Sequence, residues 1–295
     1  MKYVLTGSLG NITKPLAEKL IAAGHEVTII SSSKERESAI TKLGAKAAIG
    51  TVENAGFLDR VFKGADAIYT MVPPNFKTAD WKKYIRDTGK VYAAAIQSSG
   101  VKKVVHLSSI GAHMPVGCGP VSGMHFVEQE LDALSGVDTK LLRPGYFYTN
   151  FYGNIGMIKT AGIFGNNYGG DTTVVLTHPN DIAGAAAEEL LKLDFTGRSI
   201  RYIASDERTS KEITTVIGAA IGKPDLQYVE FKDEDALKGA MQAGLPEDVA
   251  ANFVEMGSAI RSGEMFADYK KNKPALAKTK LEDFAKEFAI AYKNS

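Results

Sequence analysis

The sequence has little cysteine, no long apolar run and almost no excess of charge. Cys118 is the only cysteine among 295 residues, which excludes a disulfide framework and a cysteine-based zinc site. No run approaches the roughly 18 apolar residues that suggest a membrane span, and the run before Gly7 is too short for a signal peptide. Thirty-five Lys and Arg against 34 Asp and Glu give a net charge of +1. We therefore expect a cytoplasmic protein that binds neither nucleic acid nor membrane.

Two common kinds of catalytic site are also absent. The histidines, at positions 25, 106, 113, 125 and 178, form no His-x-His or His-x-x-x-His pair of the kind that binds a catalytic metal. The Gly-x-Ser-x-Gly turn of serine hydrolases does not occur. The sequence therefore predicts neither a metal site nor a nucleophilic serine.

The first two-thirds of the chain alternates short β-branched runs with longer helical patterns. This alternation is typical of a parallel sheet built from strand–helix–strand units. Apolar residues at helical spacing predict helices over residues 12–23, 81–99 and 124–134. We therefore predict an α/β fold, a Rossmann-type doubly wound parallel sheet, with strands at Tyr3–Thr6, Glu26–Ser31, Ala47–Ile49, Ala67–Val72, Lys103–Ser108 and Thr139–Arg143.

The amino-acid composition changes after Asn150. Residues 151–176 are rich in glycine and asparagine, which predicts a loop. Beyond them we predict a helix to Leu193, a strand at Ser199–Ala204 and then mainly helices, with a short strand near Gln227–Phe231. This pattern predicts an NAD(P)-binding domain over 1–153, to which 177–208 returns, and a smaller, mainly helical substrate-binding lobe over 154–295.

The segment Gly7-Ser8-Leu9-Gly10-Asn11-Ile12-Thr13 lies between the first predicted strand and helix. A diphosphate requires a tight turn there and a close approach to the free N–H groups of a helix N-terminus. Gly7 and Gly10 supply the first two glycines of such a motif, and Thr13 replaces the third. A flavin, a mononucleotide or no ligand at all are the alternatives. We predict cofactor contacts from Thr6, Gly7, Ser8, Leu9, Gly10, Asn11 and Ile12.

The end of the second predicted strand reads Ser31-Ser32-Ser33-Lys34-Glu35-Arg36. NAD enzymes usually carry an acidic residue there that binds the ribose 2′-hydroxyl, whereas hydroxyls and cations suit a 2′-phosphate. Ser31, Ser32, Ser33, Lys34 and Arg36 are thus predicted to favour NADP(H) over NAD(H). There are two alternatives: Glu35 or Glu37 turns inward, or Lys34 and Arg36 are merely solvated charges at the start of a helix.

Four segments together resemble the NmrA-like family, an atypical branch of the short-chain dehydrogenase/reductase superfamily. They are Gly7-Ser-Leu-Gly10, Val104-Val-His-Leu-Ser108-Ser109-Ile-Gly-Ala, Leu142-Arg-Pro-Gly-Tyr-Phe-Tyr-Thr-Asn150 and Thr177-His-Pro-Asn-Asp181-Ile182. The resemblance implies a Rossmann fold with a smaller C-terminal lobe that binds NADP(H) or NAD(H). The family contains reductases of quinones and triphenylmethane dyes, and also catalytically silent regulators. Further cofactor contacts are predicted from Met71, Val72, Pro73, Ser108 and Pro144.

The Tyr-x-x-x-Lys pair of typical members of the superfamily is missing. Val121 and His125 occupy the places where the tyrosine and lysine are expected, so ordinary ketone reduction with a tyrosine acid is disfavoured. The same spacing occurs in Tyr228…Lys232 and Tyr269…Lys273, which we interpret as coincidences. Hydride transfer to a quinone or a conjugated cation needs no protein acid, because protons come from water.

A flat aromatic acceptor could stack in a groove formed after the last strands of the main sheet. We predict that Ser109, Tyr146, Phe147 and Tyr148 line it, with His125 and Tyr146 as weak catalytic candidates. The alternatives are that the tyrosines are core residues and that His125 is bonded to Glu128 or to the backbone.

Two functional hypotheses follow. The first is an NADPH-dependent reductase of a small aromatic or quinone-like substrate. The second is a dinucleotide sensor that couples the NADP(H) state to a protein partner, and the missing Tyr/Lys pair favours it. The sequence has no obvious partner motif, which favours the enzyme slightly. Cys118 is a candidate redox-sensitive thiol in what we expect to be a mobile loop.

Overall fold

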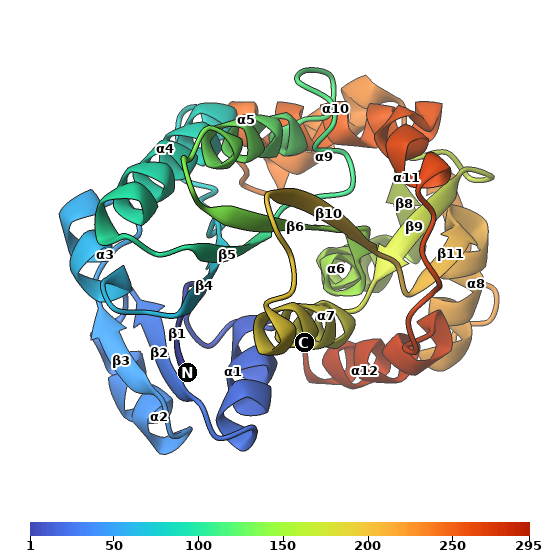
Figure 1. Cartoon of the computed structure of the whole chain (residues 1–295). Coiled ribbons are helices and arrows are strands. Elements are labelled where there is room, and N and C mark those ends of the chain that lie inside the picture. Colours follow the sequence, from blue (N-terminus) through green and yellow to red (C-terminus); the bar gives the residue numbers. More distant parts are fainter.

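The computed structural model describes residues 1–295, and its centre is a seven-stranded sheet (Figure 1). The strand order is β10-β6-β5-β4-β1-β2-β3, and all pairings within it are parallel. The direction of winding therefore reverses between β1 and β4, which is where such sheets bind ligands. The strands are β1 (Lys2–Leu5), β2 (Glu26–Ser31), β3 (Lys46–Ile49), β4 (Ala67–Met71), β5 (Lys103–Leu107), β6 (Asp138–Pro144) and β10 (Arg198–Ile203).

Helices cover both faces of the sheet (Figure 1). Val4 and Leu5, adjacent on β1, belong to different hydrophobic cores because successive side chains of a strand point to opposite faces. Burial on both faces explains the nearly continuous apolar character of these strands. One face carries α1 (Thr13–Ala22), α2 (Glu37–Lys42) and α7 (Pro179–Lys192), and the other carries α3 (Ala55–Phe62), α4 (Trp81–Ser99) and α5 (Pro120–Asp132).

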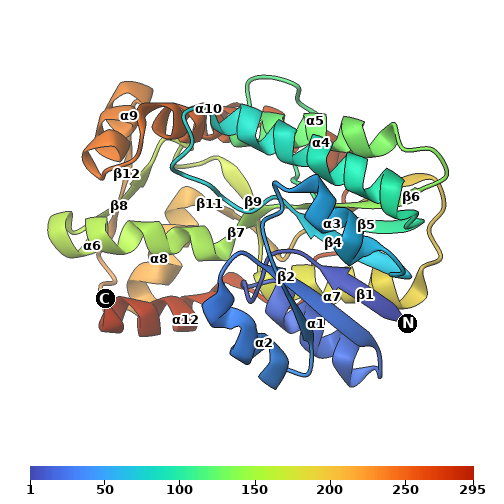
Figure 2. The ribbon, with the colours of Figure 1, turned by 90° about the vertical axis from the view of Figure 1, so that its left-hand side faces the viewer.

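A smaller lobe lies at the carboxyl ends of the strands, at the end of the molecule opposite the N-terminus (Figure 2). It has its own hydrophobic core and two small sheets, of order β11-β9-β7 and β12-β8. Its strands are β7 (Tyr146–Phe147), β8 (Ile163–Asn166), β9 (Thr173–Thr177), β11 (Asp206–Thr209) and β12 (Gln227–Glu230). Its helices are η2 (Tyr148–Asn154), α6 (Ile155–Ala161), α8 (Ser210–Ala220), α9 (Asp233–Gln242), α10 (Glu247–Ser262), η3 (Glu264–Phe266), α11 (Ala267–Lys271) and α12 (Leu281–Asn294).

The predicted α/β class and doubly wound sheet are confirmed, but the loop expected over 151–176 is wrong. That segment contains α6, β8 and most of β9. Its glycines serve other purposes: Gly162, with φ of +67°, ends α6, and Gly165 lets the ring of Phe231 approach β8. The domain boundary at residue 153 stays a prediction. No helix of the chain has both the length and the apolar character needed to cross a membrane.

Candidate functional site

The turn between β1 and α1 forms an anion cradle. Gly7 has a φ of +93°, and a Cβ there would lie 2.5 Å from Thr13 Oγ1, so a larger residue would be strained and would clash. The turn leaves four backbone N–H groups without a hydrogen-bond partner in the chain, those of Leu9, Asn11, Ile12 and Thr13. Free N–H groups at the start of a helix attract an anion, and α1 is ten residues long.

A cleft of about 580 Å³ runs over this cradle. A Cβ at Gly10 would meet the Gly7 carbonyl oxygen at 3.0 Å, so the glycines keep the backbone open to the cleft. Both the sheet and the small lobe supply walls. The lining residues are Gly7, Ser8, Gly10, Asn11, Ile12, Thr13, Ile30, Ser31, Ser32, Gly50, Thr51, Val52, Glu53, Tyr69, Met71, Pro73, Pro74, Asn75, Tyr84, Phe147, Thr149, Asn150 and Pro179. The residues present fit the diphosphate of a dinucleotide.

The end of β2 carries hydroxyls and cations. Ser31 and Ser32 line the cleft, and Ser31 Oγ accepts a 2.8 Å hydrogen bond from Ser8 Oγ. Lys34 and Arg36 follow in the short helix η1 (Lys34–Arg36), exposed and without an ion-pair partner. The only carboxylate among the lining residues is Glu53, which follows β3 and not β2. The acidic residue that NAD enzymes place after β2 is therefore absent from the cleft wall.

A second, mostly apolar cavity of about 330 Å³ adjoins the cleft. Its lining residues are Met71, Val72, Pro73, Pro74, Phe76, Trp81, Ile85, Leu107, Ser108, Ser109, Pro120, Val121, Met124, Gly145, Tyr146, Phe147, Asn150, Phe253, Met256 and Met265. Five of these also line the cleft, namely Met71, Pro73, Pro74, Phe147 and Asn150. Trp81 packs edge-on against Phe76, with 5.2 Å between the ring centroids, and lies 5.0 Å from Phe253. A ligand in the cavity would thus lie beside aromatic side chains and next to the dinucleotide cleft.

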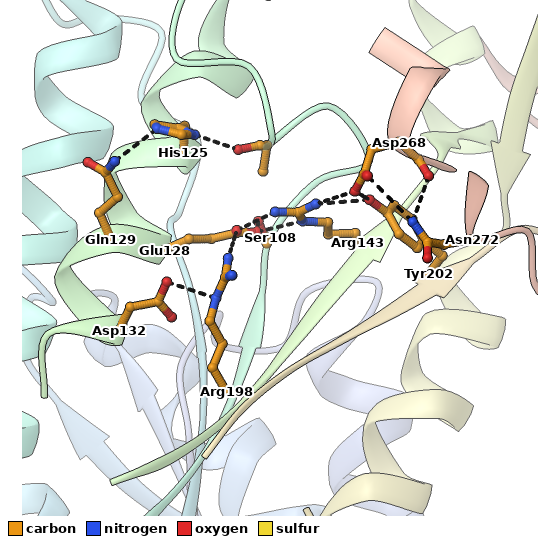
Figure 3. Close-up of polar contacts among 11 residues, drawn as sticks. Ser108, His125, Glu128, Gln129, Asp132, Arg143, Arg198, Tyr202, Asp268 and Asn272 are labelled. Atoms are coloured by element: carbon orange, nitrogen blue, oxygen red, sulfur yellow. Dashed lines mark hydrogen bonds and ion pairs between the residues drawn. The ribbon is translucent and has the colours of Figure 1, made fainter. Parts of the chain in front are cut away.

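Ser108, which lines the apolar cavity, also belongs to a buried ion network (Figure 3). The Ser108 hydroxyl donates to Glu128 at 2.5 Å, and Arg143 donates to the same carboxylate at 2.6 and 2.9 Å. Arg143 also bonds to Asp268 of the lobe, which accepts from the Tyr202 hydroxyl as well. Burial opposes the charge of Arg143, but its bonds to Glu128 hold the pKa of the guanidinium above its usual value. The hydrogen of Ser108 is committed to Glu128, so its oxygen can only accept a bond from a ligand.

Most of the predicted site residues meet at this pair of cavities. The predicted residues that line the cleft are Gly7, Ser8, Gly10, Asn11, Ile12, Ser31 and Ser32. Those that line the apolar cavity are Val72, Ser108, Ser109 and Tyr146. Met71, Pro73 and Phe147 line both. Leu9, Ser33, Lys34 and Arg36 lie beside the cleft without lining it. Thr6 and Pro144 are buried at the ends of β1 and β6, and Thr6 Oγ1 donates to the Met71 carbonyl oxygen at 3.3 Å.

Two predicted residues lie elsewhere. Tyr148 is fully buried in the core of the small lobe, stacked on Phe284 with 5.1 Å between the centroids. His125 lies on α5 away from both cavities, where its Nδ1 is 2.9 Å from the Ala112 carbonyl oxygen and its Nε2 is 3.0 Å from the amide nitrogen of Gln129 (Figure 3). Neither side chain can touch a ligand in the apolar cavity. The backbone bond is the alternative that the sequence left open for His125.

Cys118 is also not where a redox-sensitive thiol should be. It is fully buried two residues before α5, and burial raises the pKa of its thiol to about 12. A thiol that is buried and protonated reacts slowly, because the thiolate is the nucleophile.

Sequence reasoning missed the apolar walls that come from α4, α5, α10 and η3. Trp81, Ile85 and Met124 belong to helices that we predicted, yet nothing in the helical spacing distinguishes a cavity wall from a core. Phe253 and Met256 of α10 and Met265 of η3 come from distant parts of the chain and carry no motif. The residues after β3 could have been found, because Gly50–Glu53 follow the carboxyl end of a predicted strand, where ligands of such sheets bind.

Comparison with known proteins agrees with this geometry. A family model described as NAD(P)H-binding matches residues 7–161, which include the cradle and the whole of α4. No curated protein matches the sequence. The structure resembles the NADPH-dependent quinone oxidoreductase of Escherichia coli complexed with NADPH (TM-score 0.82, 18% identity, 97% of this chain and 99% of that chain). It also resembles the triphenylmethane reductase of Citrobacter sp. (0.82, 18%, 98% and 100%) and a nucleoside-diphosphate-sugar epimerase from Staphylococcus aureus (0.81, 17%, 97% and 100%). These likenesses extend over nearly the whole chain and show a shared fold.

Proposed function

The chain belongs to the NAD(P)H-binding family, and we propose that it is a reductase that uses NADPH to reduce a quinone or a similar flat aromatic acceptor. The observation that carries this proposal is the apolar cavity beside the dinucleotide cleft. A volume of about 330 Å³ and a mostly apolar lining suit a small aromatic molecule. The solved structures that share the fold include a quinone reductase and a dye reductase, as the predicted resemblance to NmrA-like proteins would suggest.

The bound cofactor would supply a hydride at its nicotinamide ring, and the protein would supply position. The cradle of Gly7 and Gly10 would hold the diphosphate, so that the ring enters where the cleft and the cavity share walls. Trp81, Phe76 and Phe253 would stack against the acceptor and exclude water. Proximity of two flat rings is enough for hydride transfer when the acceptor is already electrophilic.

The polar groups of the cavity differ in the hydrogen bonds that they can form with a ligand. Ser108 can only accept, because its hydrogen is held by Glu128. Ser109 is half-buried and forms no side-chain hydrogen bond within the chain, so its hydroxyl is free to donate to an acceptor carbonyl. Tyr146 accepts from Tyr168 at 3.1 Å, and burial raises the pKa of Tyr146, which keeps it a neutral donor. We propose Ser109 and Tyr146 as the groups that orient a carbonyl.

We further propose that NADPH is preferred over NADH. Ser31 and Ser32 offer hydroxyls to a 2′-phosphate, and the unpaired cations Lys34 and Arg36 lie just beyond them. No carboxylate from β2 lines the cleft to bind a free 2′-hydroxyl. We also propose a cytoplasmic location, which the near absence of cysteine favours.

One observation favours the second function, a silent dinucleotide sensor. Val121 faces the cavity where a tyrosine acid is expected, and His125 is turned away from it. A sensor would keep the cradle that binds the dinucleotide but would lack the groups that catalyse its oxidation. It would bind NADPH and NADP⁺ with different affinities and recruit a protein partner with only one of them.

The deciding experiment is NADPH oxidation by the purified protein, with and without a panel of quinones and cationic dyes, alongside NADH. We expect turnover that depends on the acceptor and is faster with NADPH. The double variant Ser109→Ala, Tyr146→Phe should lower turnover of carbonyl acceptors more than turnover of dyes without a carbonyl group, and those dyes are its control. Tight binding of NADPH without turnover on any acceptor would contradict the reductase and support the sensor.

A further inference from the structure

The hydroxyl of Tyr69 is buried and has no hydrogen-bond partner. Tyr69 lies on β4, its side chain is fully buried, and its oxygen contacts no donor or acceptor of the chain. The other fully buried tyrosines are all bonded. Their acceptors are the carbonyl oxygen of Leu190 for Tyr3 (2.8 Å), of Met71 for Tyr92 (2.6 Å) and of Thr279 for Tyr148 (3.4 Å), and Glu207 for Tyr269 (2.6 Å). A buried polar group without a partner is costly, so this one requires an explanation.

Tyr69 lies where a bound dinucleotide would provide that partner. Its strand neighbour in register is Leu5, and the Thr6 N–H donates to the Tyr69 carbonyl oxygen, so Tyr69 is adjacent to the start of the cradle. Tyr69 is one of the residues that line the dinucleotide cleft. Its ring belongs to the core between the sheet and helices α1 and α7, and Phe147, which also lines the cleft, packs against that core.

The Tyr69 hydroxyl is suited to donate a hydrogen bond, because it keeps its proton. Burial raises the pKa of Tyr69 well above its usual value, so the phenol stays protonated at neutral pH. A donor in a low-dielectric site forms its strongest bonds with an anionic or strongly polar acceptor. The oxygens of a diphosphate and of the adjoining ribose are such acceptors, and the residues of the cradle line the same cleft as Tyr69.

We propose that the Tyr69 hydroxyl is a cofactor-positioning group that donates a hydrogen bond to the diphosphate–ribose portion of the bound dinucleotide. The inference rests on the dinucleotide binding proposed above. The free protein keeps the hydroxyl unpaired, and binding of the cofactor relieves the cost. The Tyr69 hydroxyl therefore favours the bound state over the free state, although the hydroxyl itself contributes nothing to the stability of the free protein.

The test compares Tyr69→Phe with Tyr3→Phe in the full chain. Tyr69→Phe should unfold at the same or a higher urea concentration than the parent, because it removes an unsatisfied hydroxyl, yet bind NADPH about 10-fold more weakly. Tyr3→Phe loses a satisfied bond far from the cleft, so it should unfold at a lower urea concentration and keep its affinity. Calorimetric titration gives the affinities.

Two fragments of the cofactor locate the bond. The loss of affinity in Tyr69→Phe should persist for 2′-phospho-ADP-ribose and vanish for adenosine 2′-phosphate, which lacks both phosphates of the diphosphate and the second ribose. An unchanged NADPH affinity in Tyr69→Phe, or an equal loss for all three ligands, would overturn the proposal. If the parent itself binds none of them, the dinucleotide-binding proposal fails and this one fails with it. A parent that binds tightly beside an unaffected Tyr69→Phe removes only the role of Tyr69.

Discussion

Gly7 shows how one residue can be constrained by both conformation and contact. Its φ of +93° disfavours any side chain, and a Cβ would press on Thr13 Oγ1 at the start of α1. We expect Gly7→Ala to lower the free energy of unfolding by about 1–3 kcal/mol and to weaken NADPH binding at least 10-fold. Urea unfolding and calorimetry measure the two effects.

Gly24 supplies the control for that substitution. Its φ of +83° is similar, but a Cβ there would meet nothing within 4 Å and the residue is remote from the cleft. Gly24→Ala should therefore destabilise the protein by about 1 kcal/mol and leave the affinity for NADPH unchanged. Equal affinity in both variants would mean that the cradle does not hold the cofactor.

His106 is a residue whose burial makes stability depend on pH. It lies fully buried on β5, where Nδ1 is 2.9 Å from Thr70 Oγ1, and burial lowers its pKa from 6.5 to about 4. Between these two values the unfolded chain binds a proton that the folded chain does not, so acidification favours unfolding. From pH 7 to pH 5 this one group should remove about 2 kcal/mol of stability.

Urea unfolding at the two pH values measures that loss. His106→Asn, although less stable at pH 7, should lose less stability on acidification than the parent. His25→Asn changes a partly exposed histidine instead and should keep the full pH dependence. The same pH dependence in all three proteins would exclude His106 as its source.

At the scale of elements, the short helix η1 is where we expect the proposed preference for NADPH to be determined. Its first and last residues, Lys34 and Arg36, are exposed and unpaired next to the hydroxyls of Ser31 and Ser32. We expect the double substitution Lys34→Ala, Arg36→Ala to raise the KM for NADPH about 10-fold or more, because charge-assisted bonds to a phosphate are strong. The KM for NADH should change little.

An equivalent pair of exposed lysines tests whether any loss of charge has this effect. Lys42 and Lys63 lie at the ends of α2 and α3, outside the cleft. Their double substitution by alanine should leave both KM values near those of the parent. If it raised the KM for NADPH as much as the η1 substitutions do, the preference would reflect overall charge and not a site.

Helix α11 ties the small lobe to the main sheet through one side chain. Asp268 accepts from Arg143 of β6 and Tyr202 of β10, and the preceding η3 places Met265 in the cavity wall. Asp268→Asn should lower the free energy of unfolding by about 1–3 kcal/mol and raise the KM for the acceptor several-fold, with the KM for NADPH unchanged. Steady-state kinetics in both substrates separate the two constants.

Asp171→Asn is the matched control, because it removes an aspartate whose ion pair with Lys211 is exposed. Such pairs contribute little, so neither stability nor KM should change by much. An acceptor KM that is insensitive to Asp268→Asn would show that the contacts of Asp268 do not affect how the cavity binds its acceptor.

The elements also divide into those that the sequence predicts and those that it does not. The strands of the main sheet and α1 are predictable because burial on two faces and a helical stripe leave clear periodic patterns. The strand around Gly165 is not predictable, because a glycine in a local sequence pattern suggests a turn. In the structure this glycine makes room for the ring of Phe231, which lies 66 residues further along the chain. The cradle and the end of β2 could be predicted from local motifs, whereas Phe253 and Met265 enter the cavity through tertiary packing alone.

The whole molecule places its two cavities between two bodies with separate cores. The cleft takes Gly7 and Ser31 from the main sheet and Thr149 and Asn150 from η2 of the lobe. The apolar cavity likewise takes Trp81 from α4 and Met256 from α10. A ligand in either cavity therefore touches both bodies. Since the cradle belongs to the main body and the lobe supplies part of the apolar walls, we expect changes in the lobe to alter acceptor binding more than cofactor binding.

This arrangement predicts that the cofactor stabilises both bodies together. At 100 times its dissociation constant, NADPH should raise the free energy of unfolding by about 2.7 kcal/mol. Hydrogen exchange should slow in the β1–α1 turn and also in η2, because Thr149 and Asn150 form part of the cleft wall. Gly7→Ala, with its cradle blocked, should show neither effect at the same NADPH concentration. Protection confined to the main sheet would mean that the lobe does not contact the cofactor. The cavity would then have to bind its acceptor independently of the bound dinucleotide.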